Sequence, residues 1–198
     1  MPDLIQIVEL VDAALADASR RSGEHLVCRA GCTQCCVGVF AISQQDAARL
    51  RAGLDTLAQT DAARAQRVRL RVAESISRLE ASFPGDPLTG VLAEDDDSRA
   101  FFDEGFAEDE VCPVLDPATG TCDLYSARPI LCRTFGPPMR DEDGNLAACE
   151  LCYTTATEEE IAACEVDATI SDIEERSNAA FNAERRVTGE TIVAFALR

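Results

Sequence analysis

The sequence contains no tryptophan, no lysine and only one histidine, His25. Aromatic residues make up only 5% of the chain, so the core has to be built mainly from Ala, Leu, Ile and Val. Nucleophile schemes of the Ser–His or Cys–His type would all depend on His25. Because GxGxxG, P-loop and HExxH patterns are also missing, the common nucleotide-binding and metalloprotease classes gain no support.

Long apolar runs are missing as well. No segment approaches the ~20 apolar residues that a membrane span requires, and residues 1–20 carry acidic side chains where a signal peptide would be basic. We therefore expect a cytoplasmic protein without a membrane partner, in a compartment that keeps thiols reduced. Disulfides would require export, so metal binding is the better explanation for ten cysteines. The exclusive use of arginine as the basic residue is associated with GC-rich bacterial genomes.

The chain is strongly acidic, with 36 Asp and Glu residues, 18 basic residues and a formal net charge of −18. The negatively charged phosphate backbone of a nucleic acid would repel such a protein, so we expect no nucleic-acid partner unless a local basic stripe exists. The basic residues do cluster between Arg64 and Arg78. We interpret this cluster as a solvated helix face, with a binding patch as the alternative.

Periodicity and capping residues predict a mainly α-helical protein with small β-hairpins. Helices are expected over residues 3–21, 43–58, 61–83, 129–133, 157–166 and 171–187. Hairpins are expected over 111–124 and 139–148, where Asp-Pro and Asp-Gly pairs favour turns. Residues 83–98, which include Glu94-Asp95-Asp96-Asp97, are expected to form a loop or a mobile linker. The tail, 191–197, is expected to be a strand or a docked terminal segment.

A single domain of residues 1–198 suits this length. Within it we expect an N-terminal helix over 1–22, a cysteine cluster core over 28–152 with a helical insertion at 43–83, and C-terminal helices and a tail over 157–198. The cysteine-bearing segments are rich in turns and lack helical periodicity. We therefore expect an irregular, cysteine-rich, metal-organised centre packed by helices.

Nine of the ten cysteines fall into three groups. A short Cys-x2-Cys turn lets two thiolates converge on one metal, and backbone N–H groups of the same turn can bond to the sulfurs. Adjacent residues of an extended segment point to opposite faces, so Cys35 and Cys36 are poorly suited to one tetrahedral ion. Two centres, or one cluster with spare thiols, follow as alternatives. The candidate ligands are Cys28, Cys32, Cys35 and Cys36, then Cys112, Cys122 and Cys132, then Cys149 and Cys152.

The stretch Cys28-Arg29-Ala30-Gly31-Cys32-Thr33-Gln34-Cys35-Cys36 resembles the signature of the YkgJ-like cysteine cluster proteins, which carry the CxxCxxCC domain. The second half of that domain is similar to Cys112-Pro113-Val114-Leu115, Cys122-Asp123-Leu124-Tyr125, Arg128-Pro129 and Cys132-Arg133. The resemblance covers about Cys28 to Cys152 and implies chelation of zinc or iron. A further similarity to the cluster region of flagellin lysine methylases implies an iron–sulfur cluster as an option. The methylase activity is not carried over, because the chain is too short for that whole enzyme.

Several residues near the cysteines have two interpretations. Cys164 lies in an apolar helical stretch and is interpreted as a buried core thiol rather than a ligand. His25, just before the first cysteine group, is a candidate ligand, although a surface position at a helix exit is the simpler interpretation. The arginines beside cysteines would either offset the negative charge of clustered thiolates or be ordinary surface residues; they are Arg29, Arg128 and Arg133.

Three hypotheses for the function follow. The first is a metal-binding protein, in which zinc or iron has a structural, delivery or sensing role. The second is a redox or transferase enzyme that uses an iron–sulfur cluster. The third is a protein-interaction module held together by zinc. The metal ion is the only partner that the sequence indicates, and the identity of any protein partner stays open.

Overall fold

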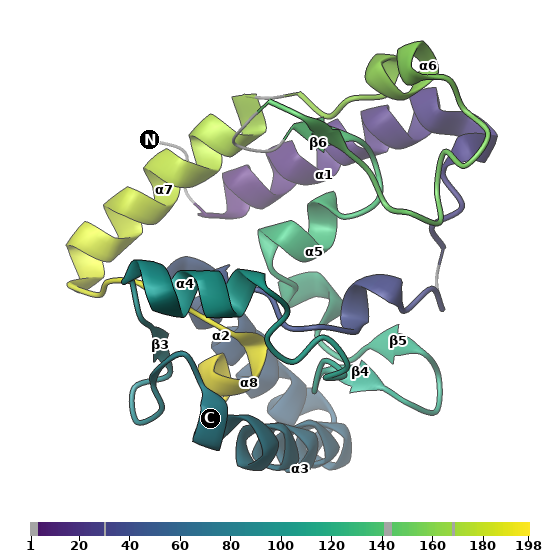
Figure 1. The fold of residues 1–198 in the computed structure, drawn as a ribbon. Coiled ribbons are helices and arrows are strands. Elements are labelled where there is room, and N and C mark those ends of the chain that lie inside the picture. Colours follow the sequence, from purple (N-terminus) through teal and green to yellow (C-terminus); the bar gives the residue numbers. More distant parts are fainter. Residues whose placement is uncertain (1–3, 30, 141–143, 168) are drawn as a thin grey trace. The chain divides into compact units, whose positions relative to one another are not determined.

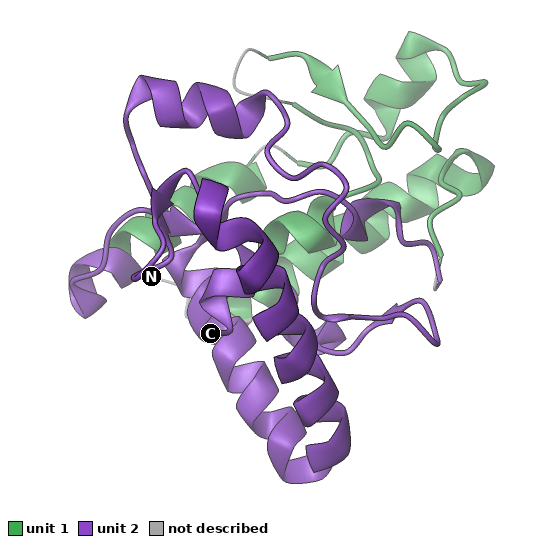
Figure 2. Ribbon diagram, turned by 60° about the horizontal axis from the view of Figure 1, so that its bottom comes forward, with its two compact units in different colours: residues 1–29, 130–180 green, residues 30–129, 181–198 purple. Residues whose placement is uncertain are grey.

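The computed structural model describes residues 4–29, 31–140, 144–167 and 169–198. The fold is mainly α-helical with short antiparallel strand pairs, as the sequence predicts (Figure 1). The chain divides into two compact units that alternate along the sequence (Figure 2). Unit 1 comprises Met1–Arg29 and Ile130–Ala180, and unit 2 comprises Ala30–Pro129 and Phe181–Arg198. The single-domain arrangement stays a prediction.

Unit 2 is built on two long helices, α2 (Gln44–Thr60) and α3 (Ala62–Leu79). The Ser43 hydroxyl accepts the Asp46 N–H and starts α2, and the Asp61 carboxylate accepts the Arg64 N–H and starts α3. Their facing sides bury a row of aliphatic residues that includes Leu50, Leu54, Val68 and Val72. Both predicted helices are therefore confirmed, and together they provide the hydrophobic core of this unit.

The C-terminal tail completes that core. Ile42–Ser43 (β1) pairs antiparallel with Glu190–Thr191 (β8), with Ile42 opposite Thr191. The short helix α8 (Val193–Ala196) follows, and Figure 1 shows it against α2 and α3. All residues from Ile192 to Leu197 are buried. The tail is thus both a strand and a docked segment, which confirms the expectation for 191–197.

The prediction of a loop over residues 83–98 was wrong in part, because residues 87–90 do form a turn but short strands and the start of a helix lie within the range. Gly85–Asp86 (β2) pairs with Val91–Leu92 (β3), and α4 (Asp96–Asp103) begins within the acidic run. The Asp95 carboxylate accepts the Ser98 N–H at 2.9 Å, so Asp95 is the N-cap of α4. Carboxylates in the first turn interact favourably with the positive end of a helix dipole. The acidic run therefore starts a helix, although its composition also suits a solvated loop.

Both predicted hairpins are present. Leu115–Asp116 (β4) pairs with Thr121–Cys122 (β5) in unit 2, and Met139–Arg140 (β6) pairs with Leu146–Ala147 (β7) in unit 1. Part of the turn between β6 and β7, residues 141–143, lies outside the described residues. The first hairpin places Cys122 on a strand, opposite Leu115.

Unit 1 is organised by α1 (Leu4–Ser22) and α5 (Ile130–Thr134). Ile7, Val11 and Leu15 pack with Ile130 and with residues near the start of α7 (Thr169–Arg185), which continues into unit 2. The buried Arg133 guanidinium lies 2.8 Å from both carboxylate oxygens of Asp12, through the same nitrogen. A third helix, α6 (Glu158–Ala163), starts with a capping box between Thr157 and Glu160. Among the described residues, no helix combines the length and hydropathy of a membrane span.

Candidate metal centre

Four of the cysteines of unit 2 lie on neighbouring segments. Cys35 and Cys36 belong to one short turn, η2 (Gln34–Cys36). The Cys112 N–H donates to the Cys36 carbonyl at 2.8 Å, and the Gly38 N–H donates to the Glu110 carbonyl at 2.9 Å. Val37 and Val111 form an antiparallel bridge between these two bonds. The segment that follows the first cysteine group is thus tied to the segment that carries Cys112.

The thiols of this group perturb one another. A side-chain hydrogen bond with Cys36, together with burial, raises the pKa of the Cys35 thiol far above its ordinary value. Burial also raises the pKa of Cys122, while the backbone N–H of Leu124 acts in the opposite direction. Cys35 and Cys122 interact electrostatically, so they belong to the same group. We name Cys35, Cys36, Cys112 and Cys122 the unit 2 thiol group.

One arginine faces this group. The Arg128 guanidinium lies 4.1 Å from the ring centroid of Tyr125, and its charge acts to lower the pKa of both Cys35 and Cys122. A cation in this position stabilises thiolates, which is one of the two interpretations that the sequence left open. Arg133, by contrast, is buried against Asp12 in unit 1. Tyr125 is 62% exposed, and its ring contacts the guanidinium of Arg128.

Unit 1 holds a second collection of thiols around the Cys149–Cys152 turn. The Cys152 N–H donates to the Cys149 carbonyl at 2.8 Å, and the two thiols are hydrogen-bonded. Burial raises the pKa of Cys152, and the backbone N–H groups of Val27 and Cys28 act to lower it. Amide groups that bond to a sulfur stabilise a thiolate. The Cys28 segment therefore lies along this turn, and we name Cys28, Cys149 and Cys152 the unit 1 thiol group.

Gly136 allows the unit 1 segments to approach one another. Its carbonyl accepts the Cys149 N–H at 3.2 Å, and its φ of +127° is a conformation that favours glycine. A Cβ at this position would lie 3.4 Å from Leu26 Cδ1 and 3.9 Å from Cys28 Cβ. The residue after Cys152 is also unusual, because Tyr153 is a non-glycine residue with a positive φ of 57°. Its N–H donates to the His25 carbonyl at 2.9 Å.

His25 and Cys164 lie in the same region. The His25 ring stacks on Tyr153, with 6.1 Å between centroids and an interplanar angle of 16°. Cys164 is buried, as predicted, but it follows α6 as the residue after its last turn. It shares a hydrophobic cluster with Cys152 and Tyr153, against which Cys149 also packs. Cys164 and Cys152 belong to different segments of the sequence, so helical periodicity gave no indication that the two residues pack together.

Within the described residues, no three His, Cys, Asp or Glu side chains are already arranged as a metal site. The thiols instead lie as adjacent pairs, Cys35 with Cys36 and Cys149 with Cys152, with further cysteines on the tied segments. Soft thiolate donors with directed amide groups fit zinc and iron. The donor chemistry therefore fits the metals that the sequence suggests. All nine cysteines remain predicted ligands, including the half-buried Cys32 and Cys132.

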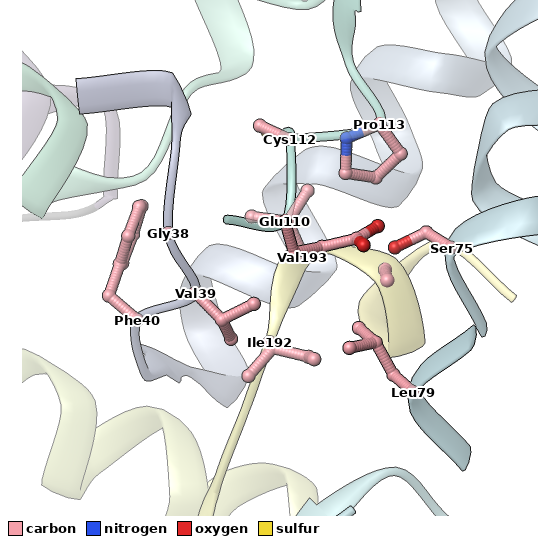
Figure 3. A pocket seen from close by; sticks show the side chains of 11 residues that line it. Gly38, Val39, Phe40, Ser75, Leu79, Glu110, Cys112, Pro113, Ile192 and Val193 are labelled. Carbon is pink, nitrogen blue, oxygen red and sulfur yellow. The ribbon is translucent and has the colours of Figure 1, made fainter. Parts of the chain in front are cut away.

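A small hollow lies beside Cys112 in unit 2 (Figure 3). Its volume is about 20 Å³, which is enough for a water molecule. Most of its walls are apolar, and the side chains of Ser75 and Glu110 face each other in it. Partial burial acts to raise the pKa of Glu110, but the ion pair with Arg78 and the nearby Ser75 hydroxyl lower it overall. This hollow is too small to be assigned a substrate.

The cysteine-bearing part of the chain matches a known family. The model of the CxxCxxCC family, described as a putative zinc- or iron-chelating domain, matches residues 27–153. The chain belongs to the CxxCxxCC family. The matched region contains every cysteine except Cys164. Comparisons with curated proteins and with solved structures found no match. Membership of the CxxCxxCC family supports a metal ion as the partner and zinc or iron as its identity.

Proposed function

We propose that the protein binds zinc or iron through thiolates at two centres, one in each unit. The observation that supports this best is the division of the ten cysteines between the units. Five lie in unit 1 and five in unit 2, so each unit has enough thiols for a four-sulfur site. The unit 1 residues are Cys28, Cys132, Cys149, Cys152 and Cys164, and the unit 2 residues are Cys32, Cys35, Cys36, Cys112 and Cys122.

The residues proposed to hold a metal in unit 2 are Cys35, Cys36, Cys112 and Cys122. Cys32 is the fifth cysteine of this unit and could replace one of the four as a ligand. Cys35 and Cys36 belong to a 3₁₀ turn rather than an extended strand. The opposite-face argument for adjacent residues therefore does not apply to them. The two thiols share a hydrogen bond, so they lie close enough to serve one centre. The Arg128 charge would offset part of the negative charge of such a thiolate set.

The residues proposed to hold a metal in unit 1 are Cys28, Cys149 and Cys152, with Cys132 as the fourth. Cys28 is exposed and Cys152 is buried, so this centre would lie at the surface of its unit. We propose a structural role for the unit 1 metal, because the unit 1 cysteines lie on turns beside few buried residues. We propose an exchangeable metal, for delivery or sensing, in unit 2, where the strand bridge and the helical core hold the cysteine segments without it.

The identity of the metal is a separate part of this proposal. We propose zinc for protein purified in air, because zinc has no redox route to loss and binds thiolates well. An iron–sulfur cluster is the alternative that the same ligands allow. When bound, zinc would hold the cysteine-bearing segments together, whereas an iron–sulfur cluster would add one-electron redox chemistry.

Anaerobic purification followed by elemental analysis and visible absorption tests both parts. A colourless protein with about two zinc ions per chain supports the proposal. A brown protein with acid-labile sulfide replaces zinc by an iron–sulfur cluster as the native occupant. Protein that retains no metal after anaerobic purification, and takes up none from added zinc or iron, contradicts the proposed function itself.

A further inference from the structure

Three arginines recur every seven residues on α3 and lie on one side of the helix. They are Arg64, Arg71 and Arg78, and each contacts the segment that carries Cys112 and Cys122. Arg64 and Arg71 both pair with Asp123, and Arg78 pairs with Glu110 at 2.7 Å. The interpretation of this cluster as a solvated helix face was therefore wrong for Arg64 and Arg71, which are half-buried.

Arg71 differs from the other two because it bonds both to the residue after Cys112 and to the residue after Cys122. Its Nε–H donates to the Pro113 carbonyl at 2.8 Å, and its Nη2 donates to the Asp123 carboxylate. Pro113 directly follows Cys112, and Asp123 directly follows Cys122. One planar guanidinium thus links the residues next to two proposed ligands, and the rigid fork of arginine allows two such bonds in one fixed geometry.

Asp123 is the buried end of this link. Its side chain is only 1% exposed, and its carboxylate binds Arg64 through one oxygen and Arg71 through the other. Its own N–H donates to the Val114 carbonyl at 2.7 Å, so the backbone at Asp123 is tied to the Cys112 side of the hairpin as well. A buried carboxylate held by two guanidinium groups has little freedom to move.

We infer that Arg71 is a positioning residue for the unit 2 thiol group, because it fixes the spacing of Cys112 and Cys122 before metal binds. The inference rests on the proposed metal centre of unit 2. Arg64 provides a matched comparison, because it shares the ion pair with Asp123 but has no described bond to Pro113. If the Arg71 link positions the thiols, a substitution of Arg71 has to weaken metal binding more than the same substitution of Arg64 does.

The test uses the full, reduced, metal-free chain and cadmium as a thiolate-seeking probe of both centres. Cadmium NMR is expected to give one resonance per centre, and Cys112→Ser identifies the resonance of unit 2. Affinities are measured by competition with a chelator of known affinity. The variants are Arg71→Lys and Arg64→Lys, which keep the charge but lose the fork, and Arg69→Lys, an exposed control on the same helix.

Arg71→Lys is expected to weaken cadmium binding at the unit 2 centre by about ten-fold, as loss of residues that orient ligands does elsewhere. Its unit 2 resonance should also shift at saturating cadmium, which a purely structural role would not cause. Arg64→Lys should have a smaller effect, and Arg69→Lys none. The unit 1 resonance should stay unchanged in all three variants and acts as the internal control.

Equal losses in Arg64→Lys and Arg71→Lys, or an unchanged unit 2 affinity in Arg71→Lys, would overturn the inference. If Arg71→Lys gives no folded protein, Asp123→Asn provides the second test, since asparagine retains an acceptor while losing the charge. Unchanged unit 2 affinity in Asp123→Asn overturns the inference as well. Absence of any cadmium resonance in the wild-type protein would instead contradict the proposed function.

Discussion

The two units carry the same number of cysteines but support them differently. In unit 2, a strand bridge, a hairpin and the Arg71 link connect the thiol segments to the core of α2, α3 and α8. In unit 1, the thiols lie on turns around Gly136 and Tyr153, beside a cluster of few buried residues. If each unit binds a metal as proposed, the metal would add to an existing packed core in unit 2, whereas in unit 1 it would take the place of such a core.

Removal of the metal is expected to have the largest effect on stability and to affect the two units differently. A structural zinc site can contribute ~10–16 kcal/mol of apparent folding free energy, comparable to the whole stability of a domain, ~5–15 kcal/mol. Chelator should lower the melting temperature. Hydrogen exchange should accelerate first in residues 25–36 and 149–156 and later in α2 and α3. Unchanged melting after verified metal removal would show that burial alone orders these segments.

Loss of single ligands should remove one metal and leave the other. Cys112→Ser and Cys35→Ser are expected to empty only the unit 2 centre, and Cys149→Ser only the unit 1 centre. The predicted ligands Cys32 and Cys132 should each reduce metal content in their own unit when changed to serine. Elemental analysis of the purified variants gives the metal content per chain.

The control for these variants is Cys164→Ser, which replaces a buried thiol without a predicted metal bond. It is expected to retain both metals and to lose only modest stability. Metal loss equal to that of Cys149→Ser would add Cys164 to the ligands of unit 1. Loss of both metals from Cys112→Ser would show that the two units share one centre.

Acidification should release metal from unit 2 before unit 1. Burial and a hydrogen bond raise the pKa of Cys35, and burial raises the pKa of Cys122, so two unit 2 thiols hold their protons tightly, while burial raises the pKa of Cys152 in unit 1. A metal must displace these protons, so apparent affinity falls as pH falls, by about ten-fold per pH unit for each proton displaced. Cadmium affinities measured between about pH 8 and about pH 6 test the order, and earlier loss from unit 1 contradicts it.

Helix caps should give the smallest effects and still distinguish the units. Asp95→Ala and Thr157→Ala each remove an N-cap acceptor, and each should cost about 1 kcal/mol of stability. The Asp95-capped helix, α4, packs through Phe102 against Phe106 and carries no cysteine. The Thr157-capped helix leads directly to Cys164. Only Thr157→Ala should therefore accelerate hydrogen exchange around Cys149 and Cys152, and equal changes in both variants would contradict this.

Local signals in the sequence predicted most of the secondary structure. Ser43 and Thr157 begin helices where expected, and Ser22-Gly23 ends α1. These features depend on hydrogen bonds and side-chain periods within a few residues, which composition and spacing reveal directly. The acidic run at Glu94 shows the limit, because the same aspartates suit a solvated loop and a helix N-terminus. Contacts between Phe102 and Phe106 favour the helix.

The sequence by itself determined that the protein is mainly helical and that it belongs to the CxxCxxCC family, and it identified the cysteines as the candidate metal ligands. Only the tertiary structure decided which cysteines are neighbours. It assigned Cys28 to unit 1 and Cys35 and Cys36 to unit 2, joined Cys36 to Cys112 through a backbone hydrogen bond, and placed Cys164 beside Cys152. Such contacts join residues far apart in the chain, and their stability depends on the packing of whole elements. No local period or spacing encodes that packing, so the spacing of cysteines indicated metal binding but not how the thiols are grouped.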